Sequence, residues 1–245
     1  MLKQDARGLR SRIRLAVLLF LSTQQFLQSQ IIWDGDCDQF WDGGCTIDDV
    51  PKTNWDNDNY PGSGSEVLIN LTGKPAVANV TVAGLAKIDV SSDFRILRDF
   101  SVTGNANLSN TKLEIDNSES LQVGGTLTTT GENLWNGGDV MAGGWENEGD
   151  LTIQGNAPWL VGTQLRNIGN ITHDGARSLR NGASFYNEGL WHFTRNNADV
   201  THDSSEGVQF TNASSGILRR SGEGVATMGV PFLNSGGALE VKSGE

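Results

Sequence analysis

The sequence predicts an all-β protein, and specifically a right-handed parallel β-helix in which a repeated unit winds into stacked coils. The pattern apolar-x-Asn-x-Gly-x-apolar-x-apolar recurs through the C-terminal half at intervals of 20 to 25 residues. Apolar and polar residues alternate around each repeat, as they do in half-buried strands. Glycine is abundant, at 31 of 245 residues, and no segment beyond residue 30 shows the 3.6-residue period of a helix.

Residues 1–30 have the character of a secretory signal peptide. Five basic residues and one aspartate precede the seven-residue apolar run Leu15–Leu21, which a polar stretch follows. Seven residues cannot span ~30 Å of hydrocarbon at 1.5 Å per residue. We therefore expect cleavage near residues 29–30, a secreted or cell-surface protein, and no membrane span in the mature chain. Cleavage leaves 13 Lys and Arg against 28 Asp and Glu, a formal charge of −15 compared with −11 for the whole chain.

An acidic, tryptophan-rich cap segment is predicted over residues 31–66. Between residues 33 and 58 it holds eight aspartates and one lysine. Cys37 and Cys45 lie close in sequence, and in an oxidising compartment they are expected to form a structural disulfide. Two thiols without a nearby histidine do not suit zinc, and the C-x-x-C spacing of a redox pair is absent.

Two features of the cap segment leave alternatives open. Asp34, Asp36 and Asp38 alternate in the chain and are candidate oxygen ligands for calcium, or else they form a solvated acidic loop. They do not form an EF-hand, because Gln39 stands where that loop requires Gly. Trp33, Trp41 and Trp55 are expected to pack as a lid over one end of the core. Trp41 and Trp55 are alternatively candidate glycan contacts, since indole rings stack on sugars.

The remaining residues, 67–245, are predicted to form β-helix repeats, and we expect the array to be truncated at its C-terminus. One unit cannot bury its apolar edge alone, so the units must stack. The asparagines are then expected to form a structural ladder along the stack, with glycine two residues later turning a corner at positive φ. About eight coils at ~4.8 Å each give a rod of ~40 Å. The ladder positions are Asn147, Asn167, Asn187, Asn212 and Asn234.

No catalytic constellation is found in the sequence, which predicts a protein that is not an enzyme. Glycoside hydrolysis needs paired carboxylates, yet Asp150 is followed at the same phase by Asn170 and Leu190. The tripeptides beginning at Thr172 and Thr201 both read Thr-His-Asp, but they lie at different phases of the repeat, so we expect all three histidines on the surface. The acidic charge disfavours nucleic acid as a partner. No cofactor is expected apart from the calcium considered above.

The C-terminal units resemble the F-x-N-x-G-x-L-x-V repeats of secreted bacterial β-helix proteins, including adhesin-like and autotransporter-passenger-like surface proteins. Trp33-Asp-Gly35, Trp41, Asn54-Trp55 and Val67–Ile69 are similar to the segment that such proteins place before their first coil. The resemblance implies a non-enzymatic extracellular or cell-surface protein, structural or adhesive, with a surface glycan or a protein of a host or neighbouring cell as partner. The alternatives are a carbohydrate-active β-helix, such as a polysaccharide lyase or hydrolase, and a carbohydrate-binding module.

Overall fold

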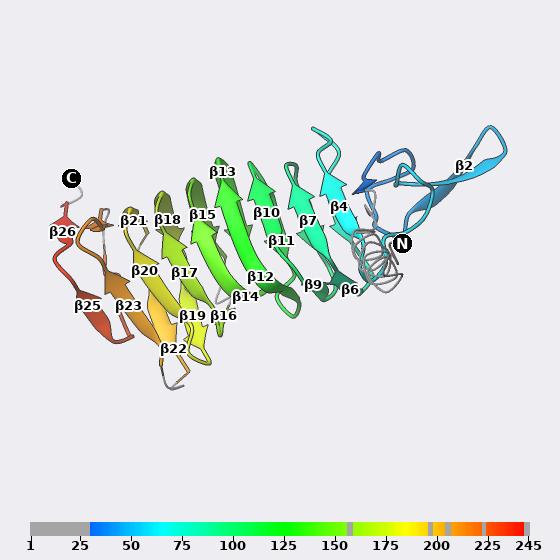
Figure 1. Cartoon of the computed structure of the whole chain (residues 1–245). Coiled ribbons are helices and arrows are strands. Elements are labelled where there is room, and N and C mark those ends of the chain that lie inside the picture. The colour runs from blue at the N-terminus through cyan, green and yellow to red at the C-terminus, as the bar shows by residue number, and fades with distance from the viewer. Residues whose placement is uncertain (1–29, 156–158, 196–197, 204–206, 222–223, 243–245) are drawn as a thin grey trace, which may run out of the picture.

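The chain forms a parallel β-solenoid in a computed structural model that describes residues 30–155, 159–195, 198–203, 207–221 and 224–242. Every regular element in this part of the chain is a strand, and successive coils stack along one axis (Figure 1). One face holds nine strands, so eight turns separate its first strand from its last. The predicted fold class is confirmed, whereas the right-handed sense of the coil stays a prediction. Residues 1–29 of the predicted signal peptide lie outside the described residues.

The coils contribute strands to three faces, the third of which ends at β22 within the described residues. The first face carries β1 (Ile31–Ile32), β4 (Glu66–Ile69), β7 (Lys87–Val90), β10 (Ala106–Ser109), the second halves of β12 (Ser120–Thr130) and β14 (Asp139–Asn147), β17 (Gln164–Asn167), β20 (Ser184–Asn187), β23 (Gln209–Asn212) and β25 (Phe232–Asn234). The second carries β5 (Ala76–Ala78), β8 (Phe94–Ile96), β11 (Lys112–Ile115), β13 (Glu132–Asn136), β15 (Asp150–Gln154), β18 (Asn170–Asp174), β21 (Leu190–Phe193), β24 (Ile217–Arg220) and β26 (Ala238–Val241). The third carries β6 (Val82–Leu85), β9 (Phe100–Val102), the first halves of β12 and β14, β16 (Trp159–Val161), β19 (Arg177–Arg180) and β22 (Val200–His202).

Alternate residues of each strand point inward and build one continuous core. On the first face, one inward row holds only aliphatic side chains in its first four coils and includes large aromatic ones in the next four. In chain order these residues, all buried, are Val67, Ile88, Ala106, Leu127, Trp145, Leu165, Phe185 and Phe210. Burial of each large apolar side chain contributes ~1.5–3 kcal/mol. Successive rings also contact each other, as Phe185 and Phe210 do at 5.8 Å between centroids. The solenoid is thus stabilised mainly by contacts between coils.

The cap segment joins the stack through β1, which pairs in parallel with β4. Beyond it, β2 (Gly44–Ile47) and β3 (Val50–Thr53) form an antiparallel hairpin that projects from the N-terminal end of the rod (Figure 1). The domain limits predicted at residues 30 and 66 stay predictions. Among the described residues there is no helix with the length and hydropathy needed to span a bilayer.

Candidate functional site

An uninterrupted row of buried asparagines follows the corner between the first and second faces. The amide Nδ2 of Asn147, Asn167, Asn187 and Asn212 each donates to Oδ1 of the next asparagine, at 2.7, 2.8, 2.8 and 2.9 Å, and the row ends at Asn234. The same Nδ2 groups reach backbone carbonyls of the following strand, such as Leu190 O at 3.0 Å from Asn167. The amides of Asn147, Asn167, Asn187 and Asn212 therefore satisfy their neighbours while remaining fully buried, whereas Asn234 at the end of the row is exposed.

Counted from β4, the row begins at Asn147 in the fifth coil. Its axial predecessors are Ile69, Val90 and Leu108, all buried and apolar. Thr129 then makes the transition, because its hydroxyl donates to Asn147 Oδ1 at 2.9 Å. Sequence reasoning placed these first coils in the stack but did not align them with the asparagine row, since an aliphatic residue there carries no distinctive motif.

Gly236, two residues after Asn234, has the predicted positive φ, at 95°, but the glycines after the other four asparagines are needed for a different reason. Gly149, Gly169, Gly189 and Gly216 do not have positive φ, so the prediction of a left-handed corner is wrong for them. Instead, the backbone of the preceding coil lies directly against each Cα. A Cβ at Gly169 would overlap the carbonyl oxygen of Gly149, and one at Gly189 would overlap that of Gly169. Close approach of backbones selects glycine here.

The three tryptophans of the cap segment pack together over the first coil. Trp41 contacts Trp55 at 4.5 Å and Phe100 at 5.2 Å between ring centroids, and Trp33 contacts Trp55 at 5.0 Å. Trp55 Nε1 donates to the carbonyl of Trp41 at 3.0 Å. Trp41 is 2% exposed and Trp55 0% exposed, so neither ring offers a face to a sugar in this conformation. A lid role for the three rings and a glycan contact by Trp41 and Trp55 both stay predictions.

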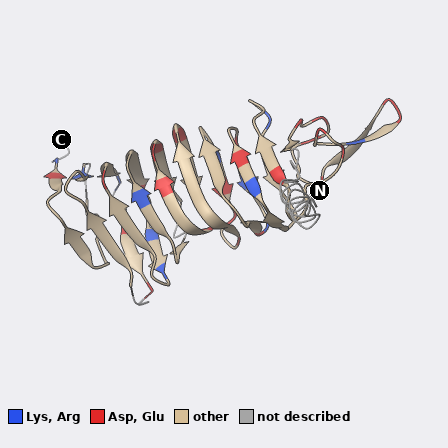
Figure 2. Ribbon diagram, viewed as in Figure 1, with Lys and Arg blue, Asp and Glu red and all other residues tan. Residues whose placement is uncertain are grey.

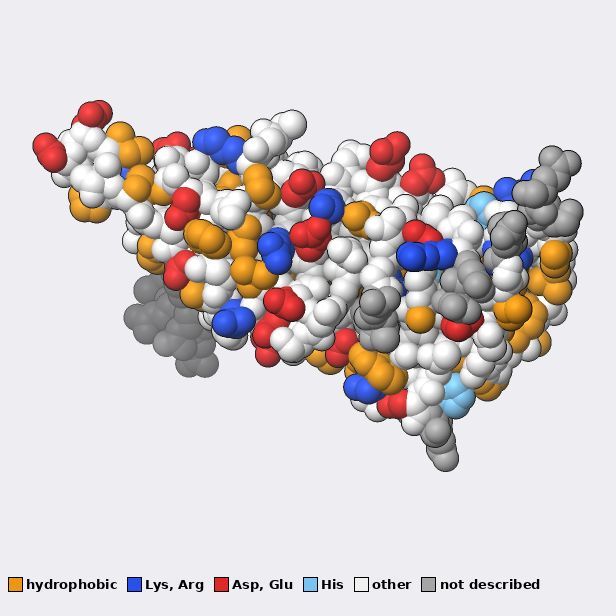
Figure 3. Space-filling model, turned by 180° about the vertical axis from the view of Figure 1, so that it is seen from behind, with side chains coloured by type: hydrophobic (Ala, Val, Ile, Leu, Met, Phe, Trp, Pro, Cys, Tyr) orange, Lys and Arg blue, Asp and Glu red, His pale blue; other side chains and the backbone are white. Residues whose placement is uncertain are grey.

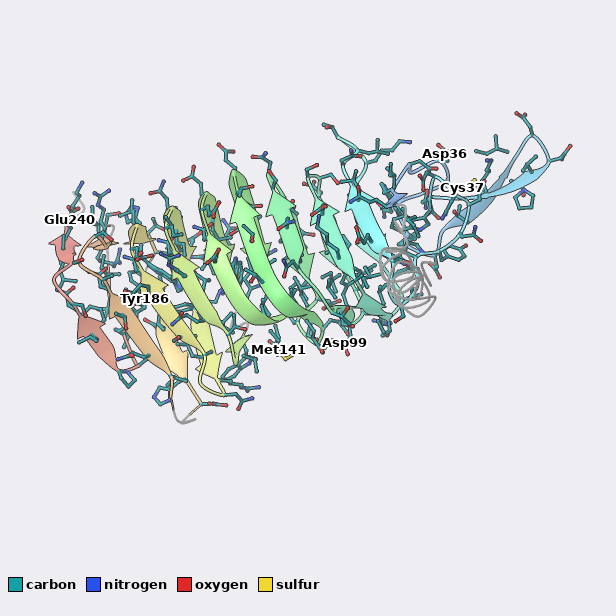
Figure 4. All side chains as sticks on the ribbon, viewed as in Figure 1. Asp36, Cys37, Asp99, Met141, Tyr186 and Glu240 are labelled. Carbon is teal, nitrogen blue, oxygen red and sulfur yellow. A yellow bond between two sulfur atoms is a disulfide. The ribbon has the colours of Figure 1, made fainter. Side chains whose placement is uncertain are left out.

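A disulfide and one buried amide fix the chain around these rings. Cys37 and Cys45 are bonded, as the sequence predicts, at the N-terminal end of the molecule (Figure 4). The buried side chain of Asn54 accepts hydrogen bonds from the amides of Cys37 and Asp38 at 2.9 and 3.0 Å. Its Nδ2 donates to Asp38 Oδ1 and to the carbonyl of Phe40, both at 2.9 Å. Sequence reasoning gave Asn54 no role, although it is the central polar residue of this segment.

Two of the three aspartates considered for calcium are engaged with the protein backbone. Asp34 Oδ1 accepts the amide of Asp36 at 3.2 Å, and Asp38 Oδ1 accepts that of Phe40 at 2.8 Å. Burial is the largest cause of a raised pKa for Asp34, and the neighbouring carboxylates add to it. In the part of the chain that the structure describes, no three His, Cys, Asp or Glu side chains gather as a metal ion would require. A calcium role for Asp34, Asp36 and Asp38 stays a prediction, which a rise of Tm with added calcium would support.

His173 is buried in the core, which corrects the expectation that every histidine lies on the surface. It follows Ile171 on the same inward row of β18, and its ring lies 4.9 Å from that of Phe193. Trp191 Nε1 donates to Nδ1 of His173 at 3.2 Å, so the neutral ring carries its proton on Nε2. Burial, followed by the positive charge of Arg177, lowers the pKa of His173 to about 3. The alternation of Ile171 and His173 was the signal that could have predicted this position.

Arg177, at the start of β19, is a second buried polar residue that sequence reasoning did not place. Its guanidinium donates to backbone carbonyls of the preceding coil, Gln154 O and, at 3.1 Å, Gly155 O. It also lies 5.1 Å from the ring centroid of Trp135. No carboxylate among the described residues forms an ion pair with it, and burial lowers its pKa. Arg177 thus ties two coils together at the corner between the second and third faces.

The outward side chains pair with their neighbours along the rod. Arg166 lies between Glu188, at 2.6 Å, and Glu146, at 3.8 Å, in three successive coils of the first face. Asn170 donates to Asp150 at 2.7 Å. His192 Nε2 and Ser221 Oγ are 2.6 Å apart. Burial is the largest cause of a lowered pKa for His192, and the neighbouring cations Arg219, Lys242 and Arg220 lower it further. A carboxylate to orient His192 as a general base is not found among its described neighbours.

Charges of both signs are interspersed over the rod, as Figures 2 and 3 show, and acidic residues predominate at the projecting hairpin. Comparison with known proteins found no matching family model, no similar curated protein and no similar solved structure. The chemistry of this chain must therefore be inferred from its own residues.

Proposed function

We propose that this chain is an extracellular or cell-surface β-helix protein with a structural or adhesive role and without catalytic activity, as in the adhesin-like proteins that its repeats resemble. The observation that carries the proposal is that polar side chains make their hydrogen bonds and ion pairs to neighbouring coils along the rod. Buried ones, such as the asparagine row, bind neighbouring coils, and outward ones, such as Arg166, form axial pairs. A catalytic site needs groups converging on a space for substrate, and axial pairing is what a rod needs.

The predicted signal peptide and the disulfide both support an extracellular location. A Cys37–Cys45 bond persists in oxidising compartments and is rare in the cytosol. Expression of the full chain in a bacterial host tests the location. We expect mature protein outside the cytoplasm, with an N-terminus near residue 30 and no free thiol. Cytoplasmic protein that retains residues 1–30 would overturn this part of the proposal.

A separate assay tests the role. Beads coated with the purified protein are expected to retain cells or surface glycans, or the protein is expected to assemble into a surface layer. In the same preparation, incubation with acidic and neutral polysaccharides is expected to yield no cleavage products. Reproducible cleavage, abolished by a single carboxylate substitution, would show that the carbohydrate-active alternative is correct.

A further inference from the structure

The hairpin of β2 and β3 has a well-defined hydrogen-bonding geometry. Ile47 faces Val50 across the two-residue turn, in which Asp48 and Asp49 have φ of 50° and 64°. Positive φ at both positions defines a type I′ turn, whose flanking residues exchange both backbone hydrogen bonds. Such pairs alternate with non-bonded ones in an antiparallel ladder. The backbone groups of Thr46 and Pro51, the next pair, therefore point away from each other toward the two outer edges, as do those of Gly44 and Thr53.

The outer edge of β3 is closed against another strand. Pro51 has no amide N–H to offer at its outward position. Thr53, the next outward residue, already donates its amide to Asp58 Oδ1 at 3.2 Å. The other oxygen of Asp58 accepts a hydrogen bond from Lys52 Nζ at 2.9 Å, which holds the carboxylate in place and lowers its pKa. Both outward donors of β3 are thus absent or occupied.

The outer edge of β2 is open by comparison. Gly44 and Thr46 direct their backbone groups outward, and β3 is the sole strand that pairs with β2 within the described residues. Proteins commonly block exposed edges with proline, charge or a covering segment. Here one edge carries such a block and the other does not. An extended peptide that adds to an open edge gains main-chain hydrogen bonds there.

The open edge is also rigid and chemically distinctive. The Cys37–Cys45 disulfide anchors β2, and Tyr60 Oη donates to the carbonyl of Asp42 at 2.9 Å beside it. Ile47 and Val50 are 41% and 51% exposed, and they adjoin the acidic turn. Figure 3 shows hydrophobic and acidic side chains together at this projecting end. A strand that fits must bring an apolar side chain opposite Ile47 and cations near Asp48 and Asp49.

We propose that the outer edge of β2 (Gly44–Ile47) binds an extended, basic segment of a partner protein, which adds as a third strand. The charge of the cap segment favours such a partner over a second copy of this chain. Residues 31–66 hold nine acidic residues and one lysine, so the cap segments of two copies would repel each other. The inference goes beyond the proposed function and stands on the hairpin alone, so it holds or fails independently of export and of the role of the rod.

The test uses the oxidised full chain and a fluorescein-labelled, terminally blocked Lys-Val-Lys-Val-Lys peptide. We expect saturable binding by fluorescence anisotropy and slower amide exchange at Gly44 and Thr46. The variant Thr46→Pro removes the outward N–H but no hydrogen bond of the hairpin, as Pro51 already does opposite it. It is expected to weaken binding by about tenfold or more, which corresponds to ~1.4 kcal/mol. Thr46→Val keeps the amide and is the matched control, expected to bind like the unaltered protein.

A second peptide keeps the test decisive if Thr46→Pro disturbs the hairpin. The same sequence N-methylated at alternate residues retains its charge but loses the donors that face β2, and we expect its binding to be lost. Equal binding of the methylated peptide, equal binding to a folded Thr46→Pro protein, or no binding at millimolar peptide would each overturn the proposal. Concentration-dependent dimerisation that Thr46→Pro abolishes would show that a second copy, and not a basic partner, occupies the edge.

Discussion

At the scale of single residues, the asparagine row shows how a polar side chain can occupy the interior of a narrow solenoid. A buried amide is costly when one of its groups lacks a partner. Asn187 avoids this cost, because it accepts from Asn167 and donates to Asn212. An isolated asparagine would gain nothing from this position. The benefit depends on the neighbours above and below, which explains why aliphatic residues suffice before Thr129 and asparagine is continuous after it.

Replacing one asparagine of the row should therefore destabilise the protein, because it removes partners from the asparagines in the coils before and after it. We expect Asn187→Leu to lower the free energy of unfolding by at least about 2 kcal/mol. This holds although leucine is tolerated elsewhere in the row, at Leu108, two coils before the first asparagine. One N–H of Asn167 Nδ2 and the Oδ1 of Asn212 would each lose their partner, at ~1–3 kcal/mol each, whereas the bond from Asn167 Nδ2 to the carbonyl of Leu190 would remain. Urea unfolding measures the change, with exposed Asn70→Ala as the control. A loss as small as that of the control would show that the row is dispensable.

The corner glycines give a second prediction, with a matched pair inside the chain. Gly169→Ala should destabilise the protein by about 1–3 kcal/mol, because the new Cβ meets the Gly149 carbonyl and the coils must separate. At Gly144 φ is not positive and a Cβ would meet no atom within 4 Å. Gly144→Ala should therefore be neutral or stabilising by about 0.4–1 kcal/mol. Equal melting temperatures for the two variants would refute the close-approach explanation.

His173 makes stability depend on pH in a defined direction. Its pKa falls from 6.5 in the unfolded chain to about 3 in the folded one, so the unfolded state binds the proton more readily. Its contribution to stability is present above pH 6.5 and is lost as the pH falls toward 3, with a slope of up to ~1.4 kcal/mol per pH unit. Replacing the histidine by Gln should flatten the curve of unfolding free energy against pH over this range. An unchanged slope in His173→Gln would contradict the buried, neutral assignment.

At the scale of elements, the strands that carry a motif were predicted individually, and most of those without one were not. Units around Asn147, Asn167 and Asn187 were predicted because alternation and the Asn-x-Gly pattern agree there. Most strands of the third face were not predicted. Strands such as β16 and β19 are three or four residues long, and alternation of apolar and polar residues over so short a segment is a weak signal. The β2–β3 hairpin was not predicted either, because its turn is formed by Asp48 and Asp49, whereas Asn-Gly is the usual sequence signal for such a turn.

The cap segment was predicted in composition but not in its internal contacts. Its disulfide followed from two nearby cysteines, whereas the role of Asn54 depends on hydrogen bonds to residues 14 to 17 positions away, which no local pattern encodes. The same applies to Arg177, whose partners lie one coil earlier. Contacts between coils are fixed by the register of the stack, and the register becomes known only when the unmarked strands are placed.

The disulfide gives a prediction for the cap segment as an element. The variant Cys37→Ser/Cys45→Ser should lose about 2–3 kcal/mol of the stability of this segment, the value expected for a short closed loop. Because the solenoid core from β7 onward makes no use of the bond, we expect an added early urea phase in tryptophan fluorescence, from Trp33, Trp41 and Trp55. The phase of the four tryptophans in the coils and the far-UV transition should move little. Coincident transitions, both shifted equally, would indicate that the cap segment and the coils unfold as one unit.

At the scale of the whole molecule, the chain uses its length to build an axis rather than an enclosed site. Inward side chains fill each coil, and outward charges such as Arg166 and Glu188 pair along the rod. The N-terminal end differs from the rest in its disulfide, its acidity and its projecting hairpin. A rod with one distinctive end suits a protein that holds or presents something, which is the basis of the function proposed.

The parallel, in-register stack is the central claim, and distances along its axis test it most directly. Leu68, Thr128 and Thr211 lie on one outward row of the first face, with Thr128 four coils from Thr211 and Leu68 seven. Nitroxide labels on cysteines at these positions, read by pulsed electron spin resonance, should give distances near ~19 Å for Thr128 and Thr211 and ~34 Å for Leu68 and Thr211, at ~4.8 Å per coil. Two distances that fail to increase with the number of coils would contradict the solenoid and everything inferred from it.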